Sequence, residues 1–192
     1  MYFIKYIFIN ISIITALSLG AFADNQREKV TSLMKENGYL LMIRHAKAPG
    51  FGDPSNIKIG DCSTQRNLNN EGRLQASKIG EVLKQNNIQA SAIFSSQWCR
   101  CLETAKLLDM GEVKELPSLN SFYEKTQNKE RHLKALKSFI NSQGTNKKLI
   151  IMVTHQVTIS AISGQYVSSG DGVLLKLNDT KPYEFVALVG NR

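Results

Sequence analysis

Cysteine and histidine are scarce in this chain of 192 residues, which has only three of each. One Cys-x-Cys pair (Cys99 and Cys101), a distant Cys62 and no histidine nearby make a poor zinc pattern, so we expect no metal cofactor. An odd cysteine count allows at most one internal disulfide. Cys99 and Cys101 are too close in sequence to bridge readily, so Cys62 would pair with one of them. Three reduced, partly buried thiols are the alternative.

The sequence also has no internal repeat, no low-complexity tract, no interdomain linker and no cluster of basic residues interleaved with aromatic ones. Its formal net charge is +8, but the lysines are scattered along the chain, as is typical of a solvated surface. We therefore expect anionic partners such as phosphates, and no nucleic acid, which would require a basic and aromatic cluster. The length suits one domain with a proper core.

A long stretch without charged residues lies at the N-terminus, between Lys5 and Asp24. It ends in Ala21-Phe22-Ala23, the small-x-small pattern of a signal-peptidase site. We predict a signal peptide over residues 1–23, cleaved after Ala23, and a domain over residues 24–192 that is periplasmic or secreted. A membrane anchor is the alternative, because the apolar stretch approaches the length needed to span a bilayer. No cysteine follows the stretch, which argues against a lipid anchor.

Apolar strand patterns alternate with amphipathic helix patterns in the rest of the chain. Helices are predicted over residues 24–36, 71–86, 97–108, 130–141 and 156–163, and strands over 39–43, 91–95, 113–116, 149–153, 173–177 and 184–189. This alternation favours an α/β fold, a three-layer α/β/α sandwich with a mostly parallel central sheet. Long irregular stretches over 46–69 and 117–128 are typical of functional loops.

Two of the apolar strands end in a reactive side chain. Arg44-His45 follows the strand over 39–43, and His155 follows the strand over 149–153. Open α/β sheets bind ligands at the carboxyl ends of their strands. A neutral imidazole can attack phosphorus, and an adjacent guanidinium matches the geometry of phosphate oxygens. Arg100, in the first turn of a helix after the strand over 91–95, can favour an oxyanion as well.

Four segments, in this order, resemble the motifs of the histidine phosphatase superfamily, also called phosphoglycerate mutase-like. They are Arg44-His45-Ala46, Leu68 to Ala76, Ser96 to Arg100 with Thr104-Ala105, and His155. The resemblance implies a phosphoglycerate mutase-like fold and metal-independent hydrolysis of a phosphomonoester. It implies that His45 is the nucleophile and that Arg44, Arg100 and His155 bind the transferring phosphoryl group. Export argues against a glycolytic mutase, and the small size argues against phytase-like relatives with a helical cap.

The resemblance leaves several candidates for the residue that protonates the leaving group. One large branch of the superfamily has Asp directly after the second histidine, where this chain has Gln156. Another branch places a Glu between the second arginine and the second histidine, and Glu124 occupies that region. We therefore predict Glu124 as the acid, with Asp53 and Asp61 as lesser candidates. Some members that act on good leaving groups have no obvious acid.

Further contacts with the substrate are predicted for Arg66, Asn67 and Gln156. Arg66 is a candidate phosphate contact, with a structural salt bridge as its alternative, whereas His132 is expected to be a surface residue. The expected substrate is a small-molecule or glycan phosphomonoester, and the sequence does not determine the oligomeric state. The alternative function is a non-catalytic phosphate-ligand binding domain of the same fold.

Overall fold

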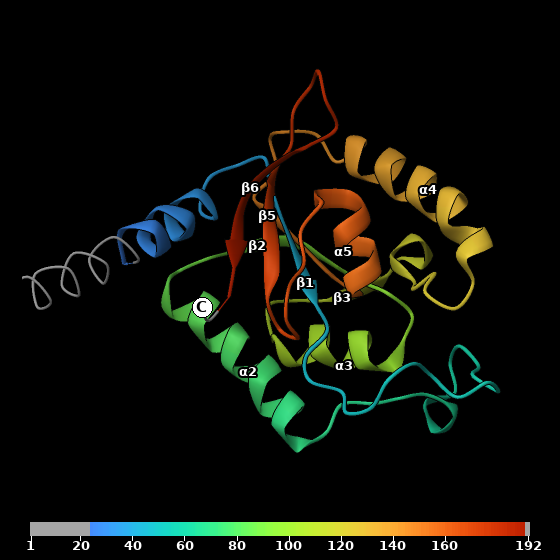
Figure 1. Ribbon diagram of the computed structural model, residues 1–192. Coiled ribbons are helices and arrows are strands. Elements are labelled where there is room, and N and C mark those ends of the chain that lie inside the picture. The colour runs from blue at the N-terminus through green and yellow to red at the C-terminus, as the bar shows by residue number, and fades with distance from the viewer. Residues whose placement is uncertain (1–23, 191–192) are drawn as a thin grey trace, which may run out of the picture.

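A six-stranded sheet forms the centre of the computed structural model, which describes residues 24–190 (Figure 1). The strands are β1 (Tyr39–Arg44), β2 (Ala90–Ser95), β3 (Val113–Glu115), β4 (Leu149–Thr154), β5 (Gly172–Lys176) and β6 (Glu184–Val189). Their order is β3-β2-β4-β1-β5-β6. The first four in this order are parallel to one another, and β5 and β6 are antiparallel to their neighbours. The mostly parallel sheet is as predicted.

Helices cover both faces of the sheet and make the fold a three-layer sandwich. The helices are α2 (Asn70–Gln85), α3 (Cys99–Leu107), α4 (Lys129–Asn141) and α5 (Gln156–Ser163), and residues 24–33 are also helical. Side chains of α2, α3 and the 24–33 segment pack on one face, and those of α4 and α5 pack on the other (Figure 1). The two predicted irregular stretches contain the short 3-10 turns η1 (Cys62–Thr64), η2 (Pro117–Leu119) and η3 (Thr126–Asn128) and an isolated β-bridge between Lys58 and Asp61.

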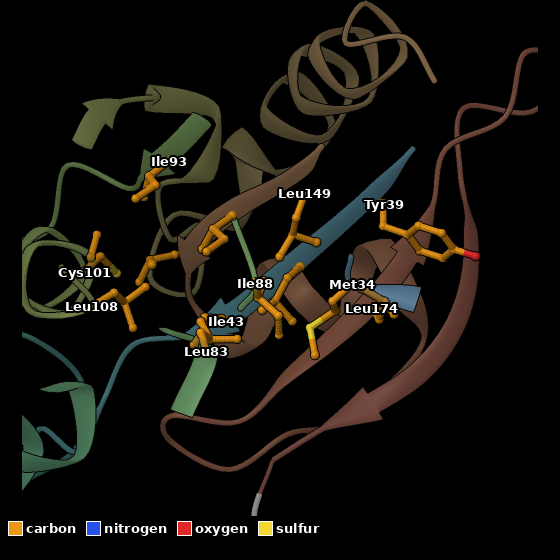
Figure 2. Packing of buried hydrophobic residues seen from close by; sticks show 14 residues of the cluster. Met34, Tyr39, Ile43, Leu83, Ile88, Ile93, Cys101, Leu108, Leu149 and Leu174 are labelled. Carbon is orange, nitrogen blue, oxygen red and sulfur yellow. The ribbon is translucent and has the colours of Figure 1, made fainter. Parts of the chain in front are cut away.

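Two apolar clusters, one on each face, hold the sheet in place. Successive side chains of a strand point to opposite faces, so Leu41 and Ile43 of β1 join a cluster with Leu83 of α2 and Leu108 (Figure 2). Leu40 and Met42 of the same strand join the opposite cluster, which contains residues of α4 and α5. A strand buried on both faces reads as an uninterrupted apolar run, which explains why β1 and β4 were recognisable from sequence.

The start of α2 fixes the chain segment that follows β1. The Asn69 side chain caps this helix by accepting a hydrogen bond from the Gly72 backbone N–H at 2.8 Å. A Cβ atom on Gly72 would lie 2.0 Å from the carbonyl oxygen of Lys47, so only glycine permits this approach. The backbone two residues after His45 is therefore held against the first turn of α2.

The predicted signal peptide, residues 1–23, lies outside the described residues. Across residues 24–190, none of the helices has both the length and the apolar character needed to cross a membrane. The predicted cleavage after Ala23 and the periplasmic or secreted location stay predictions.

Candidate active site

The two strand-end histidines meet at one edge of the sheet. Strands β1 and β4 are parallel neighbours in which Arg44 pairs with Thr154, and the His45 backbone N–H donates to the Thr154 carbonyl at 2.9 Å. The His45 and His155 rings meet edge to face with 5.6 Å between centroids, and both are almost fully buried. Together with Arg44 and Arg100 they line a cavity of about 950 Å³. The structure thus brings together the four residues predicted to carry the chemistry.

The hydrogen bonds of His45 define which ring nitrogen is free to react. Nδ1 lies 2.8 Å from the carbonyl oxygen of Ala46, an acceptor, so we assign the ring proton to Nδ1. Nε2 then accepts a hydrogen bond from Nε of Arg100 at 3.2 Å. Burial, followed by the positive charges of Arg100 and Arg44, lowers the pKa of His45 to about 3. At neutral pH the imidazole is uncharged, with its lone pair on Nε2.

Arg100 is fixed by a buried ion pair with Asp53. Its Nη1 and Nη2 atoms donate to the two carboxylate oxygens at 2.7 and 2.8 Å, and Nη1 also donates to the Arg66 carbonyl at 3.2 Å. A guanidinium has five N–H donors. These contacts use three donors and Nε–H donates to His45, which leaves one N–H of Nη2, on the same edge of the guanidinium as Nε–H. Once the Nε2 lone pair of His45 bonds to phosphorus, Nε–H is released, and this edge then matches two oxygens of the phosphoryl group.

Asp53 is therefore poorly suited to act as a proton donor, contrary to its place among the lesser candidates. Burial raises the pKa of Asp53, but hydrogen bonding to Arg100 and its charge outweigh burial and bring the pKa below its ordinary value. The Trp98 indole N–H and the Arg66 backbone N–H also donate to this carboxylate. The ionised Asp53 anchors Arg100 instead.

His155 is oriented by a chain of buried polar side chains. The Asn120 Oδ1 accepts from the Gln97 backbone N–H at 2.8 Å and from the Ser96 hydroxyl at 3.1 Å. Because the hydroxyl has one proton, Nε2 of His155, at 2.9 Å, must donate to Ser96. Burial, with the charge of Arg100, lowers the pKa of His155 well below its ordinary value. His155 is thus neutral in this structure and held by hydrogen bonds.

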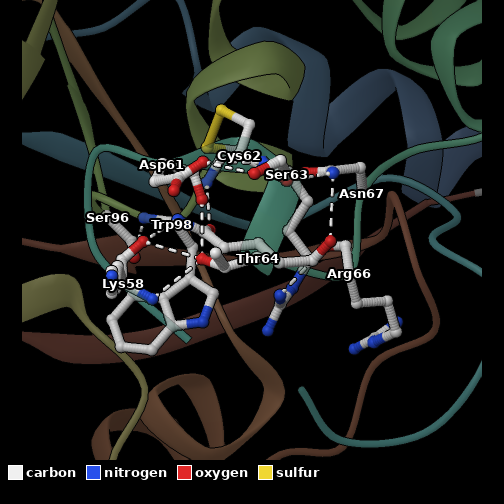
Figure 3. Close-up of a disulfide and its surroundings, with 12 residues drawn as sticks. Lys58, Asp61, Cys62, Ser63, Thr64, Arg66, Asn67, Ser96 and Trp98 are labelled. Carbon is white, nitrogen blue, oxygen red and sulfur yellow. Dashed lines mark hydrogen bonds between the residues drawn. A yellow bond between two sulfur atoms is a disulfide. The ribbon is translucent and has the colours of Figure 1, made fainter. Parts of the chain in front are cut away.

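A disulfide fastens the loop after β1 to the start of α3. Cys62 in η1 is bonded to Cys99, the residue before Arg100, with 5.7 Å between Cα atoms (Figure 3). This is one of the two predicted pairings. The remaining Cys101 is buried, and burial raises the pKa of its thiol to about 12, so it stays protonated. Among residues 24–190, no group of three or more His, Cys, Asp or Glu side chains could hold a metal ion.

Glu124, the predicted acid, lines the cavity but faces the loop that carries Asp53. Its Oε1 atom accepts a hydrogen bond from the Asp53 backbone N–H at 2.9 Å, and its side chain is exposed. Asp61, the other lesser candidate, accepts from the Ser63 N–H and caps η1; it does not line the cavity (Figure 3). Of the three candidate carboxylates, Glu124 is the one that lines the cavity and is not paired with an arginine among the described residues.

The three predicted substrate-binding residues lie in different surroundings. Arg66 lines the cavity, and its guanidinium donates to the carbonyls of Gly52, at 2.8 Å, and Ala48. Asn67 donates to the carbonyls of Cys62 and Gln65 and does not line the cavity. The structure therefore gives Asn67 a role in shaping the loop. Arg66 stabilises the same loop from the cavity side and forms no salt bridge with any acid among residues 24–190.

Gln156 also lines the cavity, but its side-chain amide is engaged within the protein. Its Oε1 accepts from the Val167 backbone N–H at 3.0 Å, and its Nε2 donates to the Ser160 hydroxyl at 2.8 Å. His132, expected at the surface, is partly buried on α4, with Nδ1 3.5 Å from the Asn120 carbonyl oxygen, and does not line the cavity.

Sequence reasoning missed the partners that orient the predicted residues. Asp53, Ser96 and Asn120 fix Arg100 and His155, and Trp98 contacts both Asp53 and the His155 ring, whose centroid lies 5.3 Å away. The two small hydroxyl residues at the end of β2 were a usable signal for Ser96. Asp53 and Asn120 lie in irregular stretches where no periodic pattern predicts the direction of a side chain.

Comparison with known families gives one match. Residues 40–126 match the model of the histidine phosphatase superfamily (branch 1). The matched range includes Arg44, His45 and Arg100 and ends before His155. No curated protein sequence matches the chain.

Solved structures of this fold cover most of the chain at low sequence identity. A protein histidine phosphatase, SixA, complexed with tungstate is 13% identical, with a TM-score of 0.56, and covers 79% of this chain and 96% of its own. A phosphoserine phosphatase mutant from Entamoeba histolytica, complexed with phosphoserine, is 15% identical, with a TM-score of 0.57, and the match covers 79% of this chain and 96% of that protein. A phosphoglycerate mutase from Plasmodium falciparum is 16% identical, with a TM-score of 0.52, and the match covers 82% of this chain and 95% of that protein. The fold is phosphoglycerate mutase-like, and the sequence match supports the histidine phosphatase superfamily.

Proposed function

We propose that this chain, which matches the histidine phosphatase superfamily over residues 40–126, is an exported phosphatase that hydrolyses a phosphomonoester through a phosphohistidine on His45. The observation that carries the proposal is the contact between Nε2 of His45 and Nε of Arg100 at 3.2 Å. It joins an uncharged nucleophile to a cation that has one unengaged N–H, and whose Nε–H becomes available to a phosphoryl oxygen when Nε2 bonds to phosphorus.

The reaction takes place in two displacements at phosphorus. In the first, the lone pair on Nε2 of His45 forms an N–P bond while the P–O bond to the leaving group breaks. The leaving oxygen takes a proton, for which Glu124 is the proposed donor. In the second, water attacks phosphorus and gives a proton to the Glu124 carboxylate, its proposed acceptor, while the N–P bond breaks and its electron pair returns to Nε2. The products are an alcohol and inorganic phosphate, and the cations of Arg44 and Arg100 stabilise the charge on the equatorial oxygens.

Excess positive charge in the cavity supports a phosphoryl ligand. Arg44, Arg66 and Arg100 line the cavity, and Asp53 is the only carboxylate paired with any of them among the described residues. The buried Nε of Arg44 has no acceptor within the described chain. Buried donors of charged groups need an acceptor, and a phosphoryl oxygen would supply one. The relatives complexed with tungstate and with phosphoserine add support by their similar fold.

The test of the proposal is turnover by purified residues 24–192. The His45→Ala variant should lose p-nitrophenyl phosphate hydrolysis by roughly a thousandfold or more, because the covalent step loses its nucleophile. His132→Ala is the matched control, since His132 does not line the cavity. Because protein groups alone carry the proposed steps, a chelator should leave turnover unchanged. Hydrolysis by His45→Ala at the wild-type rate would contradict the proposal.

Glu124 is tested by varying the leaving group. An alkyl phosphate leaves as a strong base and needs a proton, so Glu124→Gln should lower its kcat/KM by roughly a hundredfold. The p-nitrophenyl leaving group needs little protonation, and its kcat/KM should change far less. Glu130→Gln is the control, because Glu130 lies on α4 outside the cavity. An equal fall in kcat/KM for both substrates would mean that Glu124 donates no proton and only holds the loop through the Asp53 backbone.

The proposed location is tested by fractionating cells that express the full chain. A periplasmic or secreted product whose first residue is Asp24 would support export and cleavage after Ala23. A product that retains residues 1–23 in the membrane fraction would instead favour the anchor.

The second candidate function is a non-catalytic phosphate-ligand binding domain. The observation in its favour is that Glu124, the proposed acid, is exposed and bonded to the Asp53 backbone. Calorimetry that detects phosphate binding, without turnover on phosphosugars, nucleotides or phosphohistidine peptides, would favour this function over the phosphatase.

A further inference from the structure

The cavity is much larger than a phosphoryl group, and its mouth has a character of its own. Its volume of about 950 Å³ is at the upper end of the range for sites that enclose whole small molecules. The floor is formed by Arg44, His45 and His155 at the strand ends. The mouth is formed by the loop after β1 and by the irregular stretch before α4. The floor accounts for the phosphoryl group and leaves the mouth for the rest of the substrate.

An exposed aromatic pair forms one side of the mouth. Phe51 and Tyr123 line the cavity and meet edge to face, with 5.8 Å between ring centroids and an interplanar angle of 87°. Phe51 is 87% exposed and Tyr123 is 51% exposed. Exposed apolar surface at the rim of a cavity is a common mark of a ligand site, and aromatic rings bind flat apolar faces well.

Two lysines without acidic partners lie beside the aromatic pair. Lys125 and Lys129 are exposed and line the cavity, and neither forms an ion pair with any acid in the part of the chain that is described. Of the two carboxylates that line the cavity, Asp53 is paired with Arg100, and Glu124 accepts from the Asp53 backbone N–H and pairs with neither lysine. Lys47, by contrast, pairs with Glu71 at 2.7 Å. The mouth thus has two lysines against the one carboxylate of Glu124, an excess of positive charge.

We propose that the natural substrate is a phosphomonoester whose organic part has a flat apolar face and a second anionic group. The apolar face would pack against Phe51 and Tyr123, and the second anion would pair with Lys125 and Lys129. This inference rests on the proposed phosphatase function of the floor and adds the chemical class of its substrate. A phosphomonoester with a small neutral organic part would leave the mouth unused.

The test uses two substrates that differ only in the second anion. These are 3-(4-phosphonooxyphenyl)propionate and 4-propylphenyl phosphate, whose phenol leaving groups are closely similar. The wild type should prefer the propionate by roughly fivefold in kcat/KM, as expected for exposed ion pairs with two lysines, and added salt should reduce the preference. The Lys125→Gln/Lys129→Gln variant should lose the preference. The control, Lys134→Gln/Lys137→Gln, changes two lysines of α4 that lie outside the cavity and should retain it.

The aromatic pair is tested with methyl phosphate and 4-propylphenyl phosphate. Phe51→Ala/Tyr123→Ala should lower the ratio of kcat/KM for the aryl over the methyl substrate by roughly fivefold. Phe185→Ala on β6, an exposed aromatic outside the cavity, should leave the ratio unchanged. Ratios that are equal in the wild type and in both mouth variants would overturn the proposal.

A binding experiment separates failure of this proposal from failure of the phosphatase. Trp98 is the only tryptophan of the chain and lines the cavity, so its fluorescence reports ligands there. The probes are the non-hydrolysable 3-(4-phosphonomethylphenyl)propionate and 4-propylbenzylphosphonate. If the wild type binds the propionate more tightly through Lys125 and Lys129 but hydrolyses nothing, the substrate class holds and the catalytic function fails. If neither binding nor turnover depends on the mouth residues, the substrate class is wrong.

Discussion

Two walls of the cavity are built in different ways. The first, called here the strand-end wall, is the floor formed by Arg44, His45 and His155. These residues follow buried strands whose side chains contribute to both core clusters. The loop wall, formed by residues 50–66 and 121–125, has one short 3-10 turn, η1, and no helix or strand of the sheet, and it is fastened by the Cys62–Cys99 disulfide. Arg100, at the start of α3, joins the walls because it contacts both His45 and Asp53. The strand-end wall supplies the nucleophile, and the loop wall orients its main cation.

Removing the side chain that joins the walls should have the largest effect. Arg100→Gln should lower kcat/KM by roughly a thousandfold, because the phosphoryl oxygens lose a preorganised pair of donors. It should also cost about 3–5 kcal/mol of stability, since Asp53 is left buried without its partner. Steady-state kinetics and urea unfolding measure the two losses. Arg73→Gln, which breaks the exposed pair with Glu103, should change both much less. If Arg100→Gln is too unstable to assay, Arg100→Lys tests the same kinetic loss.

Asp53→Asn removes the anchor from the loop wall and retains the cation. The guanidinium should lose its fixed orientation, and kcat/KM should fall on the order of a hundredfold. The measurement is kcat/KM for p-nitrophenyl phosphate, together with a double-mutant cycle with Arg100→Lys. Asp61→Asn on the same loop is the control, because Asp61 lies outside the cavity. A rise in kcat/KM would mean that Asp53 competes with phosphate for Arg100, and the comparison of the walls would then fail.

Loss of the disulfide should weaken the loop wall more than the strand-end wall. Cys62→Ser/Cys99→Ser opens a loop with a sequence separation of 37, which corresponds to roughly 3–4 kcal/mol of stability. We expect a lower Tm, with kcat/KM reduced only severalfold, because β1 and β4 still hold His45 and His155. A reductant should lower the Tm of the wild type and leave that of the variant unchanged. A wild-type Tm that does not respond to reduction would contradict this account of the loop.

The two walls should lose stability in different ranges of pH. The pKa of His45 falls from 6.5 in the unfolded chain to about 3 in the fold, so the unfolded chain binds the extra proton between these values. The contribution of the neutral His45 to the free energy of unfolding is fully present above about pH 6.5 and is lost as the pH falls toward 3. The pKa of Asp53 is lowered from its ordinary value of 3.8, so the contribution of Asp53 to the free energy of unfolding is lost only as the pH falls below about 3.8.

Unfolding in urea at about pH 7 and about pH 5 isolates the contribution of the strand-end wall. His45 alone should lower the free energy of unfolding by about 2 kcal/mol over this interval, and His155 adds to it in the same direction. His45→Gln should reduce the drop, whereas Asp53→Asn should retain it. A drop that is the same in His45→Gln and the wild type would contradict the buried, neutral imidazole.

The sequence predicted the strand-end wall because its residues follow uninterrupted apolar runs. A run such as residues 39–43 defines both the strand and the edge at which Arg44 and His45 emerge. The helix α5 and the strand β6 have the predicted bounds, 156–163 and 184–189. Arg100 was predicted from the motif that contains it and from its place in the first turn of a helix that follows a strand.

The loop wall could not be predicted because its contacts join residues far apart in sequence. The Asp53 carboxylate meets Arg100 because the disulfide holds the loop after β1 against the start of α3, while Arg66 braces the loop internally through Gly52. In the sequence Asp53 was a possible acid, and in the structure it is an anchor whose lowered pKa keeps it ionised. Asn67 changed in the same way, from a predicted substrate contact to a residue that binds loop carbonyls.

The most direct test of the account is to trap the covalent intermediate on the strand-end wall. The purified domain would be mixed with a ³²P-labelled phosphomonoester, quenched in alkali within one turnover, and digested for peptide mapping. We predict a label that is stable in alkali, lost in acid and located on His45, and absent from His45→Asn. Full turnover by the wild type with a label on another residue, or with no label on any, would contradict the central role of His45.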